Sequence, residues 1–237
     1  GYLTEEKIEI ADKDEPVAHC VADNKTLDGL SRFANKYHPQ HAILSTVVPM
    51  TKEANVRLAL LPCPITTLTY QTPIPITNMY QTPQTLGTDR LAAVVGAHAI
   101  YPDKDVLVID AGTCITYDFV DKNGSYMGGN ISPGLKMRFT ALRQMTKKLP
   151  YVEVEAEELI PLFGKNTHDA IAAGVIRGTI FEVKGYMRAL AEQVSHFVTI
   201  ITGGNNPYII KSIESAHVEK HLVLIGLNVI LNYNENA

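Results

Sequence analysis

The alternation of apolar and polar residues along the first part of the chain predicts short strands and amphipathic helices. Residues Lys7–Ala22 alternate weakly, as edge strands do, whereas Lys25–His38 and Thr51–Leu61 follow a helical period. His41–Val48 is predicted as a short buried strand. The run Leu61–Tyr80 is rich in Pro and Thr, which favour extended segments and turns.

A helix rich in Ala and Val is predicted next, and a block of strands follows it. The helix runs from about Leu86 to Tyr101, and Thr85 is placed to cap it. Val106–Ile109 is a continuous apolar strand, and Cys114–Val120 is the next strand. The short spacing between these strands predicts a tight turn at Ala111–Thr113.

The pattern continues with a third strand and then with helices. The Asn123-Gly124 pair favours a hairpin turn before the strand Ser125–Ser132, which Gly128-Gly129 is expected to break. The remaining predicted elements are helices at Leu135–Lys147, Thr167–Val194 and Leu222–Asn232 and a strand at Phe197–Ile201.

This order of elements predicts the α/β class with a mixed sheet, because strands that follow one another are joined partly by turns and partly by helices. The change of pattern at Tyr101-Pro102 marks a domain boundary. We therefore predict an N-terminal domain over residues 1–100 and a C-terminal domain over residues 101–237.

Composition and charge narrow the class of protein. The 237 residues are 46% hydrophobic and 19% charged, which is typical of a globular protein. The net charge of −4 gives no sign of the excess positive charge with which proteins bind nucleic acid. No apolar run is long enough to cross a bilayer. The three cysteines form no C-x-x-C pair and read as reduced thiols. We therefore predict a cytoplasmic protein that binds neither nucleic acid nor membrane.

The segment from Val106 to Asp118 carries the strongest chemical signal. A buried strand delivers Asp110 to its end, and Gly112 and Thr113 follow in a turn. Such a turn directs backbone N–H groups and a hydroxyl at one point, where phosphate oxygens bind, and the carboxylate can hold a cation beside them. The alternative is a hairpin whose Asp and Thr bind only the amides of the turn. The long uninterrupted pattern favours phosphate binding.

Two further glycine clusters occur at predicted strand ends. One runs from Gly128 to Gly134, and the other is Gly203-Gly204 after the strand Phe197–Ile201. Glycine permits close approach of the backbone to a ligand or to another strand. Neither a P-loop nor a dinucleotide-binding fingerprint is present. The clusters together predict a nucleotide site of another kind.

The start of the helix after Thr85 is a second candidate site. Its sequence Leu86-Gly87-Thr88-Asp89-Arg90 places an acid and a base where free N–H groups attract anions. Asp89 can accept a proton from an attacking hydroxyl, and Arg90 can bind a carboxylate or phosphate. The alternative is an acid that merely complements the helix dipole.

The long helix predicted at Thr167–Val194 carries small residues at four-residue spacing. Ala170, Gly174 and Gly178 form a smooth stripe, which favours close packing against another helix within the chain or across a dimer. Asn166-Thr167 is predicted to cap this helix, with Asp169 in its first turn.

Taken together, these motifs resemble the type III pantothenate kinase family over most of the chain, from about Ile43 to Leu231. They occur in the order found in that family. The matching segments are Pro75–Tyr80, Leu86–Ala93, Asp110–Asp118, Gly128–Gly134, Asn166-Thr167 and Thr202–Gly204.

The resemblance implies two ribonuclease-H-like domains of the actin-like ATPase fold with ATP in the cleft between them. It also implies ATP-dependent phosphorylation of pantothenate to 4′-phosphopantothenate, the first step of coenzyme A biosynthesis, with Mg²⁺ and a monovalent cation, K⁺ or NH₄⁺. It further implies a homodimer with the pantothenate site near the subunit interface.

The resemblance also assigns roles by position. It makes Asp89 the catalytic base and Asp110 the ligand near the monovalent cation. The residues that it implies for pantothenate are Tyr80, Gly87, Thr88, Arg90 and Thr167. Those that it implies for ATP are Gly112, Thr113, Gly203 and Gly204.

One departure from the family concerns the first residues. Members of the family begin with a strand and a D-x-G-N-T phosphate loop, which this sequence lacks. We expect about 15–20 further residues ahead of Gly1, judging from the usual length of a strand–turn–strand unit. The alternative is a non-catalytic family member that acts as a regulatory or accessory binding protein.

Overall fold

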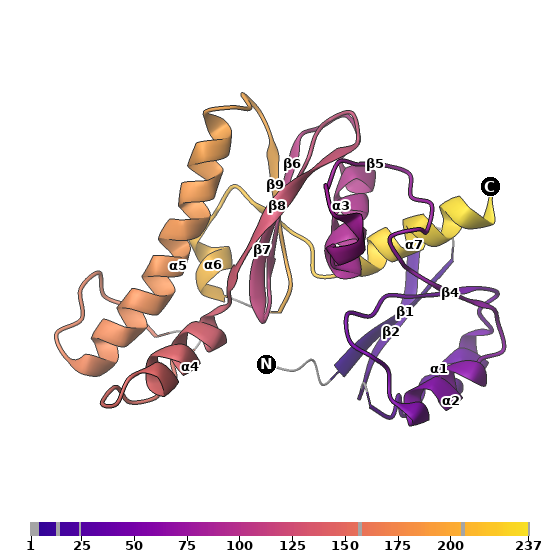
Figure 1. Cartoon of the computed structure of the whole chain (residues 1–237), viewed down its shortest axis with the longest axis horizontal. Coiled ribbons are helices and arrows are strands. Elements are labelled where there is room, and N and C mark those ends of the chain that lie inside the picture. The colour runs from indigo at the N-terminus through magenta and orange to yellow at the C-terminus, as the bar shows by residue number, and fades with distance from the viewer. Residues whose placement is uncertain (1–4, 13–14, 24, 156–157, 205–206, 237) are drawn as a thin grey trace. The chain divides into compact units, whose positions relative to one another are not determined.

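The computed structural model describes residues 5–12, 15–23, 25–155, 158–204 and 207–236, which belong to two compact units (Figure 1). Unit 1 comprises Lys104–Asp121 and Gly128–Lys220. Unit 2 comprises the chain up to Asp103, the segment Lys122–Met127 and the chain from His221 onward. The predicted domains 1–100 and 101–237 are two halves of the actin-like fold. The division of the chain into these two compact units does not test that prediction.

Unit 2 contains two small sheets and four helices among its described residues. Strands β1 (Glu5–Asp12) and β2 (Glu15–Asp23) form an antiparallel hairpin. Strands β3 (Ala42–Leu44) and β4 (Ile65–Thr67) pair in parallel. The other elements are α1 (Leu30–Tyr37), α2 (Lys52–Ala59), β5 (Thr77–Asn78), the 3-10 turn η1 (Pro83–Thr85), α3 (Thr88–Ile100) and α7 (Leu222–Glu235).

Helices α3 and α7 lie against each other with their backbones almost in contact (Figure 1). A Cβ atom at Gly226 would lie 1.8 Å from the carbonyl oxygen of Ala92, and one at Gly96 would lie 2.5 Å from that of Leu222. Glycine at both positions therefore permits this approach. The contact buries Ala92 together with Ile230 in the core of unit 2.

Unit 1 is built on a mixed sheet in the order β10-β9-β6-β7-β8. Strand β6 (Val106–Ala111) pairs antiparallel with β7 (Cys114–Val120) and parallel with β9 (Val198–Thr202). Strand β10 (His217–Val218) pairs parallel with β9, and the first residues of β8 (Ser125–Pro133) pair with β5 within unit 2. The helices are α4 (Leu135–Met145), α5 (Thr167–Ala191) and α6 (Pro207–Ser212).

Strand β6 is buried over most of its length, as its uninterrupted apolar sequence predicts. Leu107 and Ile109 pack with Ile201 of β9, Val183 of α5 and Ile209 of α6. Full burial of a side chain of this size contributes about 1.5–3 kcal/mol. This core holds the carboxyl ends of β6 and β9 next to each other.

Helix α1 begins at Leu30, later than the predicted start at Lys25. The carboxylate of Asp23 accepts hydrogen bonds from the backbone N–H groups of Lys25 (2.9 Å) and Thr26 (3.1 Å). Gly29 then adopts a φ of 87°. A side chain that binds the nearby backbone competes with the helix, and a left-handed residue does not continue one. The helix therefore starts only after this turn.

Thr85 does not cap α3, contrary to the prediction. It lies in η1, where its hydroxyl donates to the carbonyl oxygen of Thr82 at 2.9 Å, and Gly87 occupies the cap position. The predicted strand 41–48 is limited to β3, because the Thr46 hydroxyl donates to the carbonyl oxygen of Val48 at 2.7 Å and forms a local turn.

The predicted break of the third strand does not occur. Strand β8 is continuous through Gly128-Gly129, although Gly128 has a φ of 109°. The α/β class with a mixed sheet is confirmed. No helix within the described ranges is both long enough and apolar enough to span a bilayer.

Candidate functional site

The carboxyl ends of β6 and β9 lie next to each other in unit 1, and a glycine turn follows each of them. Asp110 of β6 stands directly opposite Thr202 of β9 in the parallel ladder. The turn at Gly112 follows the first strand, and Gly203-Gly204 follows the second. In open α/β sheets, ligands bind at the carboxyl ends of the strands. The register of β6 and β9 therefore creates one candidate binding edge.

The glycine turns at this edge are in close contact. Gly203 has a φ of +97°, and a Cβ atom there would lie 2.4 Å from Asp110 Oδ1 and 2.8 Å from the backbone of Ala111. The backbone N–H of Gly134 donates to the carbonyl oxygen of Thr113 at 3.0 Å. A Cβ atom at Gly134 would lie 2.4 Å from that same oxygen. The structure thus gathers glycines from three strand ends around Asp110.

Asp110 has a second oxygen group beside it. Thr116 of β7 is its direct partner in the antiparallel ladder, so both side chains emerge on the same face of the sheet. The hydroxyl oxygen of Thr116 is buried and has no hydrogen-bond partner in the described part of the chain. A carboxylate next to an unsatisfied hydroxyl oxygen suits a cation that takes oxygen ligands. Sequence reasoning did not single out Thr116, because its position depends on strand register.

The start of α3 in unit 2 carries a buried arginine. Arg90 is only 6% exposed. Its guanidinium donates to the phenol oxygen of Tyr126 at 3.2 Å and lies 5.8 Å from the centre of the Tyr80 ring. The two tyrosine rings are parallel, with centroids 6.1 Å apart. Arg90 is therefore held in place by aromatic groups. Tyr126 escaped sequence reasoning because it occupies a core position of a strand.

The carboxylate of Asp89 lies at the N-terminus of the same helix. Its Oδ1 accepts the backbone N–H of Arg90 at 2.8 Å. A Cβ atom at Gly87 would lie 2.4 Å from that oxygen, so glycine leaves room for the carboxylate. The Thr88 hydroxyl is 2.8 Å from the hydroxyl of Ser45. Unit 2 thus places Thr88, Asp89 and Arg90 together in the first turn of α3.

Thr167 is the first residue of α5 in unit 1, and its side chain is exposed. The Asn166 side chain accepts the backbone N–H of Asp169 at 2.9 Å, which confirms the predicted cap. Tyr80 and Arg90 belong to unit 2. Neither unit alone therefore holds the complete set of residues predicted for pantothenate.

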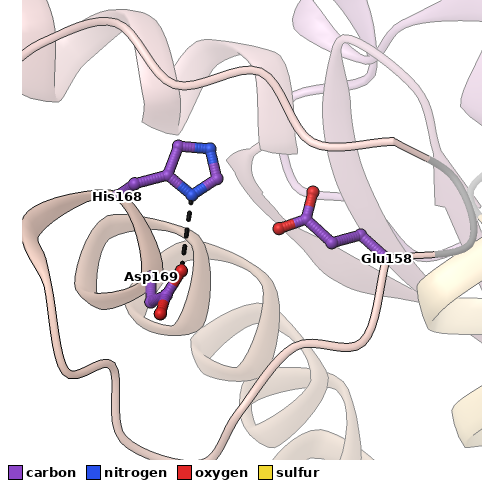
Figure 2. A group of neighbouring side chains, drawn as sticks. All are labelled: Glu158, His168 and Asp169. Carbon is purple, nitrogen blue, oxygen red and sulfur yellow. Dashed lines mark ion pairs between the residues drawn. The ribbon is translucent and has the colours of Figure 1, made fainter.

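Glu158, His168 and Asp169 form a group at the N-terminus of α5 that sequence reasoning missed (Figure 2). One ligand atom from each lies within 4.8 Å of the others. His168 Nδ1 is 3.5 Å from Asp169 Oδ1, as the dashed line in Figure 2 marks. Acids favour the first turn of a helix without any metal, so this arrangement alone assigns no ion.

A half-buried polar network lies next to the turn at Pro133-Gly134. Glu182 Oε1 accepts hydrogen bonds from Tyr117 (2.8 Å) and Ser132 (2.5 Å), and its Oε2 pairs with Arg138 at 2.6 Å. Burial alone would raise the pKa of Glu182, but these hydrogen bonds and the charge of Arg138 lower it below its usual value. Burial and the hydrogen bond to the Glu182 carboxylate raise the pKa of Tyr117 well above its usual value.

Solved structures share this fold at low sequence identity. A Campylobacter jejuni protein described as a Baf family transcriptional activator has a TM-score of 0.61 and 22% identity, covering 93% of this chain and 92% of its own. A Listeria monocytogenes protein assigned as an N-acetylmannosamine kinase has a TM-score of 0.55 and 13% identity, covering 99% and 97%. The fold is that of the actin-like ATPases and sugar kinases, as predicted.

Sequence comparison identifies the family within this fold. The family model for type III pantothenate kinase matches residues 7–189. The type III pantothenate kinase of Phocaeicola vulgatus is 45% identical over 230 residues, which cover 97% of this chain and 94% of that protein. The chain belongs to the type III pantothenate kinase family.

Proposed function

We propose that this protein transfers the γ-phosphoryl group of ATP to the primary hydroxyl of pantothenate. The product, 4′-phosphopantothenate, is the first intermediate of coenzyme A biosynthesis. The observation that carries the proposal is the 45% identity to a type III pantothenate kinase over 97% of the chain. The geometry supports it, because one unit holds the Asp89 carboxylate at the N-terminus of α3 and the other gathers glycine turns around Asp110.

Asp89 acts as the base in this proposal. Phosphoryl transfer depends mainly on positioning and charge stabilisation, because its transition state is loose. Asp89 takes the proton of the pantothenate hydroxyl, and the backbone N–H of Arg90 holds its Oδ1 at 2.8 Å. Arg90 supplies a fixed positive charge for the substrate carboxylate. Tyr80, Gly87, Thr88 and Thr167 complete the set of residues proposed for pantothenate.

The turns at the end of the sheet bind the phosphates of ATP in this proposal. Thr113, Gly203 and Gly204 contribute main-chain donors and one hydroxyl, and Gly112 shapes the turn, because its own N–H donates to the carbonyl oxygen of Cys114 at 2.9 Å. Asp110, with the unsatisfied oxygen of Thr116 beside it, holds the monovalent cation, K⁺ or NH₄⁺. Mg²⁺ bound with ATP neutralises negative charge on the phosphates.

We further propose a cytoplasmic homodimer. Cβ atoms built at Gly174 and Gly178 of α5 meet no atom within 4 Å, so the described chain does not pack against this part of the stripe. Phe181 is also exposed on α5. A second copy of the chain would cover this surface, and sedimentation equilibrium should give the mass of a dimer. Cys63 and Cys114 are free thiols, as expected in a reducing compartment.

The direct test is ADP release by the full-length protein in the presence of pantothenate, Mg²⁺ and K⁺. We expect turnover that requires pantothenate and that falls when K⁺ is replaced by Na⁺. A folded protein that binds ATP but releases no ADP with pantothenate would contradict the proposal. That outcome would favour the accessory binding protein considered from the sequence.

Asp89→Asn tests the role of the base. The change keeps the shape of the side chain and removes its ability to take a proton, so we expect kcat to fall by about 10²–10⁴-fold. Asp103→Asn is the matched control, because Asp103 is exposed beyond the other end of α3 and its φ of 62° suits asparagine. Equal kcat values in the two variants would remove Asp89 from this role.

A further inference from the structure

We propose that Glu182, acting through Arg138, positions the Thr113 turn for the phosphates of ATP. This inference rests on the phosphotransferase function proposed above and adds two positioning residues to it. Neither residue belongs to the motifs quoted above for the resemblance to the family. Both lie in unit 1, on the helices α5 and α4.

The first link joins helix α5 to the end of strand β8. Arg138 donates from Nε to the carbonyl oxygen of Pro133 at 2.7 Å and from a terminal nitrogen to Glu182 Oε2 at 2.6 Å. The planar guanidinium holds these donors in a fixed relative geometry. A lysine side chain has a single nitrogen, which cannot reproduce the two separate donors of the guanidinium. Arg138 therefore fixes the position of Pro133 relative to α5.

The second link joins the end of β8 to the turn proposed for ATP. The backbone N–H of Gly134, which follows Pro133, donates to the carbonyl oxygen of Thr113 at 3.0 Å. A Cβ atom at Gly134 would lie 2.4 Å from the carbonyl oxygens of both Gly112 and Thr113, so the backbones are in direct contact. Protein interiors transmit small shifts because they are close-packed. A displacement at Pro133-Gly134 therefore moves the Thr113 turn.

The network around Glu182 is built to keep its carboxylate in one place. Tyr117 from β7 and Ser132 from β8 both donate to Oε1, while Arg138 occupies Oε2. The Glu182 and Arg138 side chains are 25% and 21% exposed. At that burial the pair is screened less than a fully solvated surface pair. The lowered pKa of Glu182 keeps the carboxylate charged at neutral pH.

The expected effect is specific to ATP. Glu182 lies about four helical turns from Thr167 along α5, roughly 22 Å at 1.5 Å per residue. The other residues proposed for pantothenate belong to unit 2. A loss of the Glu182–Arg138 pair should therefore change the binding of ATP and leave the KM for pantothenate unchanged.

The test uses Glu182→Gln in the full-length protein. Glutamine keeps the size of the side chain and an acceptor for Tyr117 and Ser132, but it removes the charge that holds Arg138. Calorimetry with a non-hydrolysable ATP analogue and Mg²⁺ should show affinity about tenfold weaker, which corresponds to about 1.4 kcal/mol. The KM for ATP should rise by the same factor, with the KM for pantothenate unchanged.

Arg138→Lys provides a second, independent variant that keeps the positive charge and loses the fork. We expect weaker binding of the ATP analogue in this variant too. If both residues act along one path, the double variant should bind no more weakly than the weaker single variant. Additive losses would contradict a shared path.

Asp28→Asn is the matched control. It removes an ion pair with Arg57, 2.6 Å apart, in unit 2, whereas the network belongs to unit 1. We expect wild-type affinity for the ATP analogue in this variant. The inference is wrong if Glu182→Gln binds the analogue within twofold of the wild type, or if the KM values for both substrates rise together. Wild-type protein that binds the analogue without phosphorylating pantothenate would contradict the proposed function and still allow this comparison.

Discussion

Two adjacent glycines provide a sharp test of how the candidate ATP edge is built. Gly203 has a φ of +97°, and a Cβ atom there would lie 2.4 Å from Asp110 Oδ1 and 2.8 Å from the backbone of Ala111. A Cβ atom at Gly204 would meet nothing within 4 Å. Gly203→Ala should therefore lower the stability of the folded chain strongly, whereas Gly204→Ala should change that stability little. The two variants differ by one position and carry the same chemical change.

The magnitude for Gly203→Ala has two sources. An alanine in a left-handed conformation costs about 1–2 kcal/mol. Overlap with atoms that cannot move freely adds about 1–3 kcal/mol, and the backbone of Ala111 belongs to the buried strand β6. A total of about 3 kcal/mol corresponds to a fall in Tm of roughly 6–12 °C for a chain of this size. Relief of the overlap would also displace the Asp110 carboxylate.

Differential scanning calorimetry of the wild type and both variants measures this difference. Titration with an ATP analogue, with and without K⁺, reports on the displaced carboxylate. We expect Gly203→Ala to lose thermal stability and the effect of K⁺ on binding, and Gly204→Ala to keep the thermal stability of the wild type. Equal Tm values for the two variants would refute the argument that the Gly203 backbone is in contact with Asp110 and Ala111.

Two other predictions concern packing and pH. Gly226→Ala should lower Tm, because its Cβ atom would lie 1.8 Å from the carbonyl oxygen of Ala92. Gly185→Ala has open space around it, so its folded state should gain up to about 1 kcal/mol of stability from helix propensity. Equal changes in Tm for the two variants would contradict the close α3–α7 contact. The pKa of Tyr117 is higher in the folded chain than in the unfolded chain, so its phenol ionises at a lower pH when the chain is unfolded. The stability that this group contributes is therefore present below about pH 10 and is lost as the pH rises further. Urea unfolding between about pH 8 and pH 11 should show this loss of stability in the wild type and in Tyr233→Phe but not in Tyr117→Phe. The same change of unfolding free energy with pH in all three proteins would contradict this role of Tyr117.

Much of the central sheet was predictable from local patterns. The strand Cys114–Val120 has the predicted bounds, because the turns before and after it carry strong signals in Gly112 and in Asn123-Gly124. The start of α1 was not predicted correctly. There the side chain of Asp23 binds the following backbone, a local competition that apolar periodicity does not report.

The candidate site was only partly predictable. The motifs predicted Asp110, Gly112 and Gly203 as candidate site residues because acids and glycines at strand ends are local signals. Thr116 and Tyr126 were not identified, since one depends on the register between strands and the other reads as an ordinary core residue. Their positions beside Asp110 and Arg90 become visible only when the neighbouring strand or helix is placed beside them.

The sequence by itself determined the class of fold, the family, and the positions of the strongest motifs. The class of fold depends on the period of apolar residues and on glycine, proline and capping residues, which act over a few neighbouring positions. The family follows from the similarity of the whole sequence to known members. Tertiary structure alone decided that Gly134 contacts the Thr113 turn and that Glu182 pairs with Arg138. Such contacts join segments far apart in the chain, and they depend on strand register and helix packing, which local patterns do not encode.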